Sequence, residues 1–170
     1  MTVLRTENLI LRPARAEDAS ALFEVYGDAR AMRYWDRLPH ESVAETGALV
    51  AGIMKMAPPA RYFVVEHGGR VVGTAGFWRD AEIGYILHPM VWGKGMGAEL
   101  LKRLIDYGFG ALGFDRITAE TDPDNAVSNH MLTAAGFQET GRAERTLRVG
   151  DRWVGSIYFE LTRDEKGPPD

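Results

Sequence analysis

The 170-residue sequence contains no cysteine, and this absence removes a whole set of chemistries. Disulfide bonds, thiolate metal sites and a cysteine nucleophile are all excluded. No run of about eighteen apolar residues is present to span a bilayer, and the opening MTVLRTENLI lacks the apolar core of a signal peptide. We therefore expect a soluble, cytoplasmic protein with no membrane partner.

An excess of basic residues is also missing. The 20 lysines and arginines are outnumbered by 24 aspartates and glutamates, so the net charge is −4. Nucleic-acid binding depends on a basic surface that contacts phosphates, so no nucleic-acid partner is expected. The four histidines show no metal-ligand spacing, and no metal site is predicted.

Hydrophobic residues make up 45% of the chain, which is enough for one core. We expect a single domain over residues 1–163 and a flexible C-terminal tail over 164–170. Ser42 and Glu45 form a capping-box pattern at the start of a helix. Apolar spacing predicts helices over 17–26, 42–56, 96–112 and 126–135. Beta-rich runs predict strands over 9–12, 62–66, 71–78, 81–87, 116–120, 138–147 and 153–161.

Residues 87–97, LHPMVWGKGMG, join an apolar strand to a strongly helical segment through a glycine-spaced loop. The first N–H groups of a helix have no intrahelical partner, and the peptide dipoles add partial positive charge there. Gly93, Gly95 and Gly97 let the backbone curl and approach a ligand closely, and Lys94 adds a cation. The loop therefore predicts a cradle for phosphate or pyrophosphate.

Three types of phosphate loop compete for these residues. A Walker A loop fails, because Lys94 is followed by Gly95 instead of Ser or Thr. A Rossmann dinucleotide loop fits by spacing, with Ala98 as its third small residue and Asp115 as its acid, but the preceding chain indicates antiparallel hairpins. The third type is the acetyl-CoA loop of the GNAT acetyltransferases, (Q/R)xxGxG/A. WGKGMG is similar to it, with Trp92 at the Gln/Arg position, which resembles the RimJ/RimL branch.

The resemblance to this branch continues at TENLILRPARAED (6–18), AEIGYILHP (81–89) and DNAVSNHMLTAAGF (124–137). It implies a mixed α/β (α+β) GNAT fold. The expected sheet is twisted and mostly antiparallel, has six to seven strands, is flanked by about four helices, and is splayed between its fourth and fifth strands. It also implies an enzyme that moves an acetyl group from acetyl-CoA (coenzyme A) to a primary amine by direct transfer in a ternary complex. The acceptor would be a protein N-terminal α-amine, as for the ribosomal-protein-alanine acetyltransferases, or a small amine, and a homodimer is possible.

The resemblance further implies site residues for acetyl-CoA. The pantetheine arm would pair with the backbone of the fourth strand, and the amide of its last residue would polarise the thioester carbonyl, an oxyanion-type role. The strand residues are Tyr85, Ile86 and Leu87; the cradle residues are Trp92, Gly93, Lys94, Gly95, Met96 and Gly97. Asn125 would contact the pantetheine arm, and Ser128 would lie near the sulfur as a proton donor. Both residues also suit helix capping.

For the acceptor amine, Glu82 is the candidate general base and a candidate substrate-binding residue. Alternation along a strand places Glu82 on the same face as Gly84 and Ile86, where an amine would approach. Tyr34 and Trp35 are the candidate aromatic wall for the substrate, with core packing as the alternative.

Two other functions stay open. Some members of the branch carry acidic residues where this chain has Thr146, Leu147 and Gly155. A non-catalytic module that binds or senses acyl-CoA is therefore the second hypothesis, and a Rossmann-type dinucleotide binder is the third.

Overall fold

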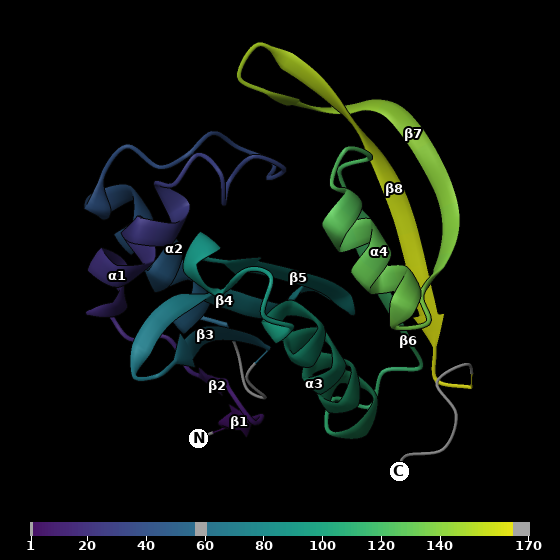
Figure 1. Ribbon diagram of the computed structural model, residues 1–170, viewed down its shortest axis with the longest axis horizontal. Helices are drawn as coiled ribbons and strands as arrows, with labels where there is room; N and C mark the ends of the chain where they lie inside the picture. Colours follow the sequence, from purple (N-terminus) through teal and green to yellow (C-terminus); the bar gives the residue numbers. More distant parts are fainter. Residues whose placement is uncertain (1, 57–60, 165–170) are drawn as a thin grey trace.

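A computed structural model describes residues 2–56 and 61–164 of the chain (Figure 1). The predicted flexible tail lies outside the described residues except for Asp164. Within the described part, no helix is both long enough and apolar enough to cross a membrane.

The part of the chain that the structure describes forms one sheet of eight strands in the order β1-β2-β3-β4-β5-β6-β8-β7. Neighbouring strands are antiparallel except β5 and β6, which are parallel. The strands are β1 (Leu4–Arg5), β2 (Ile10–Arg12), β3 (Tyr62–His67), β4 (Arg70–Arg79), β5 (Glu82–Leu87), β6 (Arg116–Thr121), β7 (Gln138–Val149) and β8 (Arg152–Thr162). All seven predicted strands are present, and the short β1 is added to them. The mostly antiparallel order confirms the expected fold class and excludes the parallel sheet of a Rossmann domain.

Within the described residues, four α-helices cover the two faces of this sheet. They are α1 (Asp18–Tyr26), α2 (Val43–Met54), α3 (Met96–Gly110) and α4 (Ala126–Ala134), and a short 3₁₀-helix, η1 (Pro89–Val91), precedes α3. Ser42 caps α2 as predicted, because its hydroxyl accepts from the N–H of Glu45 at 3.2 Å. The Glu45 carboxylate accepts from the N–H of Glu41 at 2.9 Å, one residue before the expected capping-box partner.

Two apolar clusters lie on opposite faces of the sheet. Leu22 and Val25 of α1 and Val50 of α2 pack with Ile86 of β5. Residues of α3 and α4 pack on the other face with Ile83 and Leu87 of the same strand, together with residues of β6 and β8. Strand β5 therefore turns alternate side chains to the two faces, as the sequence pattern predicts.

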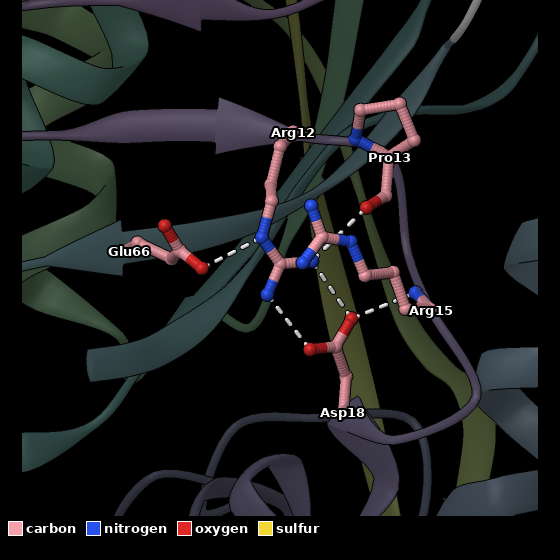
Figure 2. A network of polar contacts seen from close by, with 5 residues as sticks. All are labelled: Arg12, Pro13, Arg15, Asp18 and Glu66. Carbon is pink, nitrogen blue, oxygen red and sulfur yellow. Dashed lines mark hydrogen bonds and ion pairs between the residues drawn. The ribbon is translucent and has the colours of Figure 1, made fainter. Parts of the chain in front are cut away.

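A buried arginine joins three elements on the α1 side of the sheet. Arg12 of β2 binds both carboxylate oxygens of Asp18 at 2.7 and 2.9 Å, and its Nε donates to Glu66 of β3 at 2.6 Å. Figure 2 shows this network, in which Asp18 also accepts from the N–H of Arg15 at 2.7 Å. The contacts fix the start of α1 against β2 and β3.

The sheet opens between β5 and β6, the fourth and fifth of the predicted strands. Glu82 lies opposite Thr118, and the N–H of Thr118 donates to Ala81 at 3.1 Å. Pairing between the two strands is confined to this end, so they diverge toward their C-terminal ends. In Figure 1, β7 and β8 curve away from the first half of the sheet with α4 beside them. The expected splay is confirmed.

Candidate active site

A cavity of about 1160 Å³ occupies the opening between β5 and β6. Its walls come from both strands, the connection between α1 and α2, the start of α3, the helix α4, and the hairpin of β7 and β8. The predicted site residues that line it are Tyr34, Trp35, Glu82, Tyr85, Ile86, Leu87, Trp92, Gly93, Gly95, Met96, Gly97, Asn125 and Ser128. Lys94 is not among the lining residues, and its Nζ donates to the carbonyl of Met90 at 2.9 Å.

The cradle at the start of α3 has the backbone that its glycines predict. Gly93 and Gly95 have φ angles of 69° and 77°, which L-amino acids with a side chain rarely adopt. Gly95 is the N-cap of α3 and brings no side-chain cap, so the first-turn N–H groups are left for an anion. A Cβ on Gly97 would lie 3.0 Å from the Met131 sulfur, so this glycine serves packing. The loop therefore leaves backbone N–H donors for a phosphate or pyrophosphate group.

Backbone groups of β5 turn toward the opening. The N–H of His88 donates to Val72 of β4 at 2.7 Å, and Leu87 lies opposite Gly73. Because hydrogen-bonded and non-hydrogen-bonded pairs alternate in an antiparallel ladder, the N–H of Leu87 points away from β4. The same alternation applies to Tyr85, whereas the backbone of Ile86 faces β4. Of the three predicted strand residues, Tyr85 and Leu87 can offer backbone N–H groups to a pantetheine arm.

Trp92 has a role that the sequence did not reveal. Its indole Nε1 donates to the carbonyl of Leu87 at 2.9 Å. The side chain at the Gln/Arg position of the loop pattern therefore holds the last peptide of β5 in place. The five-residue separation gave no indication of this contact, because η1 folds the chain back between the two residues.

Tyr85 and Ser128 meet across the opening. The Tyr85 hydroxyl lies 2.8 Å from the Ser128 hydroxyl, which joins β5 to the first turn of α4. Burial raises the pKa of Tyr85, and the hydrogen bond to Ser128 opposes part of that rise. Asn125 caps α4, since its Oδ1 accepts from the N–H of Ser128 at 3.2 Å. Asn125 therefore caps a helix, which was one of its two predicted roles. Its contact with the cofactor stays a prediction.

The opposite end of the cavity is aromatic and partly charged. Glu82 is half-buried at the closed end of the opening, with its carboxylate 3.7 Å from Arg79. Gly84 leaves room there, since a Cβ on it would be 3.7 Å from the Tyr62 hydroxyl. Burial raises the pKa of Tyr62 to about 12, so this hydroxyl keeps its proton at neutral pH. Trp35 lines the cavity and also packs edge-on against Tyr26 with a ring-centroid distance of 5.8 Å, so it takes part in core packing, and its contact with a substrate stays a prediction.

Sequence reasoning missed Glu120 at this end of the cavity. The Ser156 hydroxyl donates to the Glu120 carboxylate at 2.6 Å and lies 2.6 Å from the Thr146 hydroxyl. A signal was available, because Ile117 and Ala119 alternate with polar residues along 116–121. That pattern turns Glu120 to the same face as Glu82 once the strands are known to be neighbours.

The described residues form no cluster of metal ligands. Among residues 2–56 and 61–164, no group of three or more histidine, aspartate or glutamate side chains is placed to hold a metal ion.

Comparison with known proteins agrees with this geometry. Residues 8–138 match a family model described as an acetyltransferase (GNAT) domain. The chain is 32% identical to the uncharacterized N-acetyltransferase p20 of Bacillus licheniformis, over 97% of this chain and 98% of that protein. It is 30% identical to the spermidine N(1)-acetyltransferase of Escherichia coli K12, over 86% and 82%. Mycobacterium smegmatis RimJ in complex with CoA-disulfide has a similar structure, with a TM-score of 0.82, 26% identity and coverage of 98% and 88%.

Proposed function

Because this chain belongs to the GNAT acetyltransferase family, and is therefore an acetyl-CoA-dependent N-acetyltransferase, we propose that it acetylates a primary amine by direct transfer in a ternary complex. The observation that carries the proposal is one continuous cavity that joins the α3 cradle to an aromatic end lined by Glu82. We expect acetyl-CoA and the acceptor amine to occupy this cavity at the same time. The sequence contains no cysteine to carry the acetyl group between them.

At the cradle end, the chain supplies backbone groups. The N–H groups at the start of α3 bind the pyrophosphate of acetyl-CoA, and the N–H of Leu87 donates to the thioester carbonyl oxygen. This donor becomes more effective as negative charge develops on that oxygen. Trp92 supports it by holding the Leu87 carbonyl at 2.9 Å.

Ser128 is the proposed donor of a proton to the leaving sulfur. Its hydroxyl is hydrogen-bonded to the buried Tyr85 hydroxyl, which stays protonated because burial raises the pKa of Tyr85. Tyr85 can therefore donate to the Ser128 oxygen as Ser128 donates to sulfur, which stabilises the charge that develops on the serine.

Glu82 has two predicted roles, and its position favours acceptor binding. Five residues separate Glu82 from Leu87, which is about 16 Å along a strand. A nitrogen that attacks near the Leu87 amide is beyond direct reach of this carboxylate. At the closed end of the cavity, Glu82 attracts the cationic acceptor, and Tyr34 and Trp35 offer ring faces to it. A small cationic amine or the α-amine of a peptide fits these groups.

The test is acetyl-CoA-dependent thiol release with three acceptors: spermidine, L-methionine sulfone and a peptide that begins with alanine. We expect at least one acceptor to raise thiol release above the acceptor-free rate and to gain the mass of one acetyl group. If acetyl-CoA binds and none of the three raises the rate, the non-catalytic acyl-CoA-binding hypothesis is favoured instead. Homodimer formation and a cytoplasmic location stay predictions.

A further inference from the structure

The connection between α1 and α2 forms one wall of the cavity. Its residues 28–42, the acceptor wall, contain no helix or strand, and they include Tyr34 and Trp35. The backbone hydrogen bonds within the wall are local turns, such as those from Met32 to Asp28 at 3.0 Å and from Trp35 to Met32 at 3.1 Å. A segment of this kind depends on contacts with its neighbours to keep one conformation.

His40 lies near the end of the acceptor wall, where the chain approaches α2. It lines the cavity, yet only 5% of it is exposed, whereas His67, His88 and His130 are at least partly exposed. The N–H of His40 donates to the carbonyl of Tyr26 at 2.8 Å. A titratable side chain is therefore buried where the wall meets α1.

The His40 side chain contacts both helices. Its Nδ1 lies 2.8 Å from Oγ1 of Thr46 on α2, a residue that is 0% exposed. Its ring stacks on the ring of Tyr26 on α1, with centroids 5.1 Å apart and an angle of 15° between the planes. The Tyr26 ring meets the edge of Trp35, and the Tyr26 hydroxyl lies 2.6 Å from Oγ1 of Thr74 on β4. One set of contacts thus links the wall, Trp35 included, to α1, α2 and the sheet.

These contacts suit the neutral form of His40. A neutral imidazole either accepts from the Thr46 hydroxyl through Nδ1 or donates to it, so both tautomers satisfy the pair. An imidazolium would bring a full charge into a site that is 5% exposed and whose side-chain partner is a neutral hydroxyl. Because burial of an ion in such surroundings is costly, the closed wall favours the neutral ring.

The charged groups around His40 leave this preference in place. Burial lowers the pKa of His40 below its usual 6.5, Glu45 on α2 opposes part of this decrease, and Arg37 of the wall adds to it. Arg37 is paired with Asp36, with 2.9 Å between Nε and Oδ1. Tyr26 on α1 is uncharged, because burial raises the pKa of its hydroxyl well above 10.

A lowered pKa makes the closed wall sensitive to acid. When the wall opens, His40 reaches water and its pKa returns to about 6.5. Below that pH the open form takes up a proton that the closed form resists. The closed form is therefore fully favoured above about pH 6.5 and loses stability as the pH falls toward the lowered value. Between pH 7.5 and pH 5.5, the opening equilibrium shifts by about tenfold at most.

We propose that His40 is a positioning residue for the acceptor amine: the neutral imidazole holds the acceptor wall closed, and its protonation opens the wall. The inference rests on the proposed function, because it concerns an acceptor that lies against Tyr34 and Trp35. His40 acts through these two residues and does not take part in the transfer. An amine therefore binds more weakly in acid, in addition to the slower reaction that follows from its own protonation.

Backbone hydrogen exchange tests the opening without any acceptor. It is followed at the N–H groups of Met32, Trp35 and His40 at pH 7.5 and pH 5.5, with each rate divided by that of an unstructured peptide at the same pH. In the wild type we expect the protection to fall several-fold at the lower pH, by about tenfold at most. In His40→Asn, whose amide can bond to Thr46 without titrating, we expect equal protection at both pH values.

His67→Asn is the matched control. It replaces a histidine whose Nδ1 also has a hydrogen-bond partner, the carbonyl of Asn8 at 2.9 Å, and which does not line the cavity. We expect the protection of the acceptor wall in H67N to depend on pH as it does in the wild type.

The positioning role is tested by acceptor binding to the complex of the enzyme with coenzyme A, where no transfer follows. The probe is whichever of spermidine, L-methionine sulfone or the alanine-initiated peptide the wild type acetylates, and calorimetry gives its dissociation constant. We expect this constant to be about two- to tenfold higher at pH 5.5 than at pH 7.5 in the wild type and in H67N. In H40N it should be the same at both pH values, which a merely structural role would not produce.

Equal protection of the wall at both pH values in the wild type overturns the inference, and so does a loss of protection in H40N that matches the wild type. A pH-independent dissociation constant in the wild type overturns the positioning role. If H40N does not fold, Thr46→Val decides, because it keeps the histidine and removes its side-chain partner. We expect T46V to lower the protection several-fold at pH 7.5, and unchanged protection overturns the inference. Failure of all three acceptors with the wild type contradicts the proposed function, while the exchange measurement still decides whether His40 holds the wall.

Discussion

The hydroxyl groups of Tyr85 and Ser128 form a side-chain contact at the cavity wall. It joins residues 43 positions apart at 2.8 Å. Neither residue type is unusual in a strand or a helix, and the contact exists because the splay brings α4 beside β5. The tyrosine remains a donor at neutral pH, because burial raises the pKa of Tyr85.

Removal of the Tyr85 hydroxyl should affect turnover more than folding. We expect Tyr85→Phe to lower kcat about tenfold, since Ser128 loses its donor, and to reduce the free energy of unfolding by about 1 kcal/mol. Tyr107→Phe is the matched control, because Tyr107 of α3 packs its ring against Phe63 of β3 and does not line the cavity. Steady-state assays and denaturant unfolding of both variants check this. Equal kcat in the two variants would mean that the Tyr85 hydroxyl has only a packing role.

For single residues, the sequence predicted the contacts that form between residues close together in the chain. The Ser42 cap and the capping capacity of Asn125 follow from residue type and a spacing of three. Two other contacts could not be predicted in this way: the hydrogen bond from Trp92 to Leu87 and the one from Ser156 to Glu120. Each depends on how a later segment of the chain folds back. Glu120 was missed for this reason, although its strand pattern was visible.

Among the elements, α3 is flanked by glycines whose positive φ angles side chains disfavour. Gly95 at φ 77° is its N-cap, and Gly113 at φ 70° follows its other end. A Cβ at either position meets nothing within 4 Å, so strain comes only from the backbone angle. The two glycines therefore form a matched pair, one in the cradle and one outside it.

We expect Gly95→Ala and Gly113→Ala to lower the free energy of unfolding by a similar amount, about 1 kcal/mol each. Only G95A should weaken acetyl-CoA binding, by about tenfold, because a strained N-cap moves the N–H groups that face the pyrophosphate. Titration calorimetry with acetyl-CoA measures the difference. The same dissociation constant in both variants would place the pyrophosphate elsewhere.

Among the described residues, periodicity predicted the four α-helices and seven of the strands, with ends within a few residues of those observed, but not the short 3₁₀-helix η1. The strand β1 was not predicted, because two residues, Leu4–Arg5, are too few to show alternation. The register between β5 and β6 could not be predicted from the sequence either. Their parallel contact joins segments separated by α3, and one pair, Glu82 with Thr118, sets the level of every residue across the opening.

For the whole molecule, the Arg12 network ties the N-terminal elements to the sheet (Figure 2). Burial alone would raise the pKa of Asp18, but the hydrogen bonds from Arg12 and Arg15 outweigh it and lower that pKa below 3.8. A carboxyl group whose pKa is lower in the folded protein stabilises it above the unfolded value, and the contribution is lost as the pH falls through the folded value. Stability from this network should therefore be complete at pH 7 and decline below about pH 4.

Asp18→Asn should lower the free energy of unfolding at pH 7 by about 3 kcal/mol, because it leaves the buried Arg12 with one carboxylate partner fewer. The variant should also lose less stability between pH 5 and pH 3 than the wild type does. Asp115→Asn, at an exposed pair 3.9 Å from Arg163, is the control and should change stability by less than about 0.5 kcal/mol. Urea unfolding at the two pH values tests both, and equal losses in the two variants would contradict the account.

The central claim for the whole molecule is that one cavity holds acetyl-CoA and the amine together and that the acetyl group passes directly between them. Initial rates measured while both concentrations are varied test it most directly. Double-reciprocal plots that intersect are the predicted result, because a ternary complex must form before either product leaves. Parallel lines, the signature of an acetylated enzyme intermediate, would contradict direct transfer.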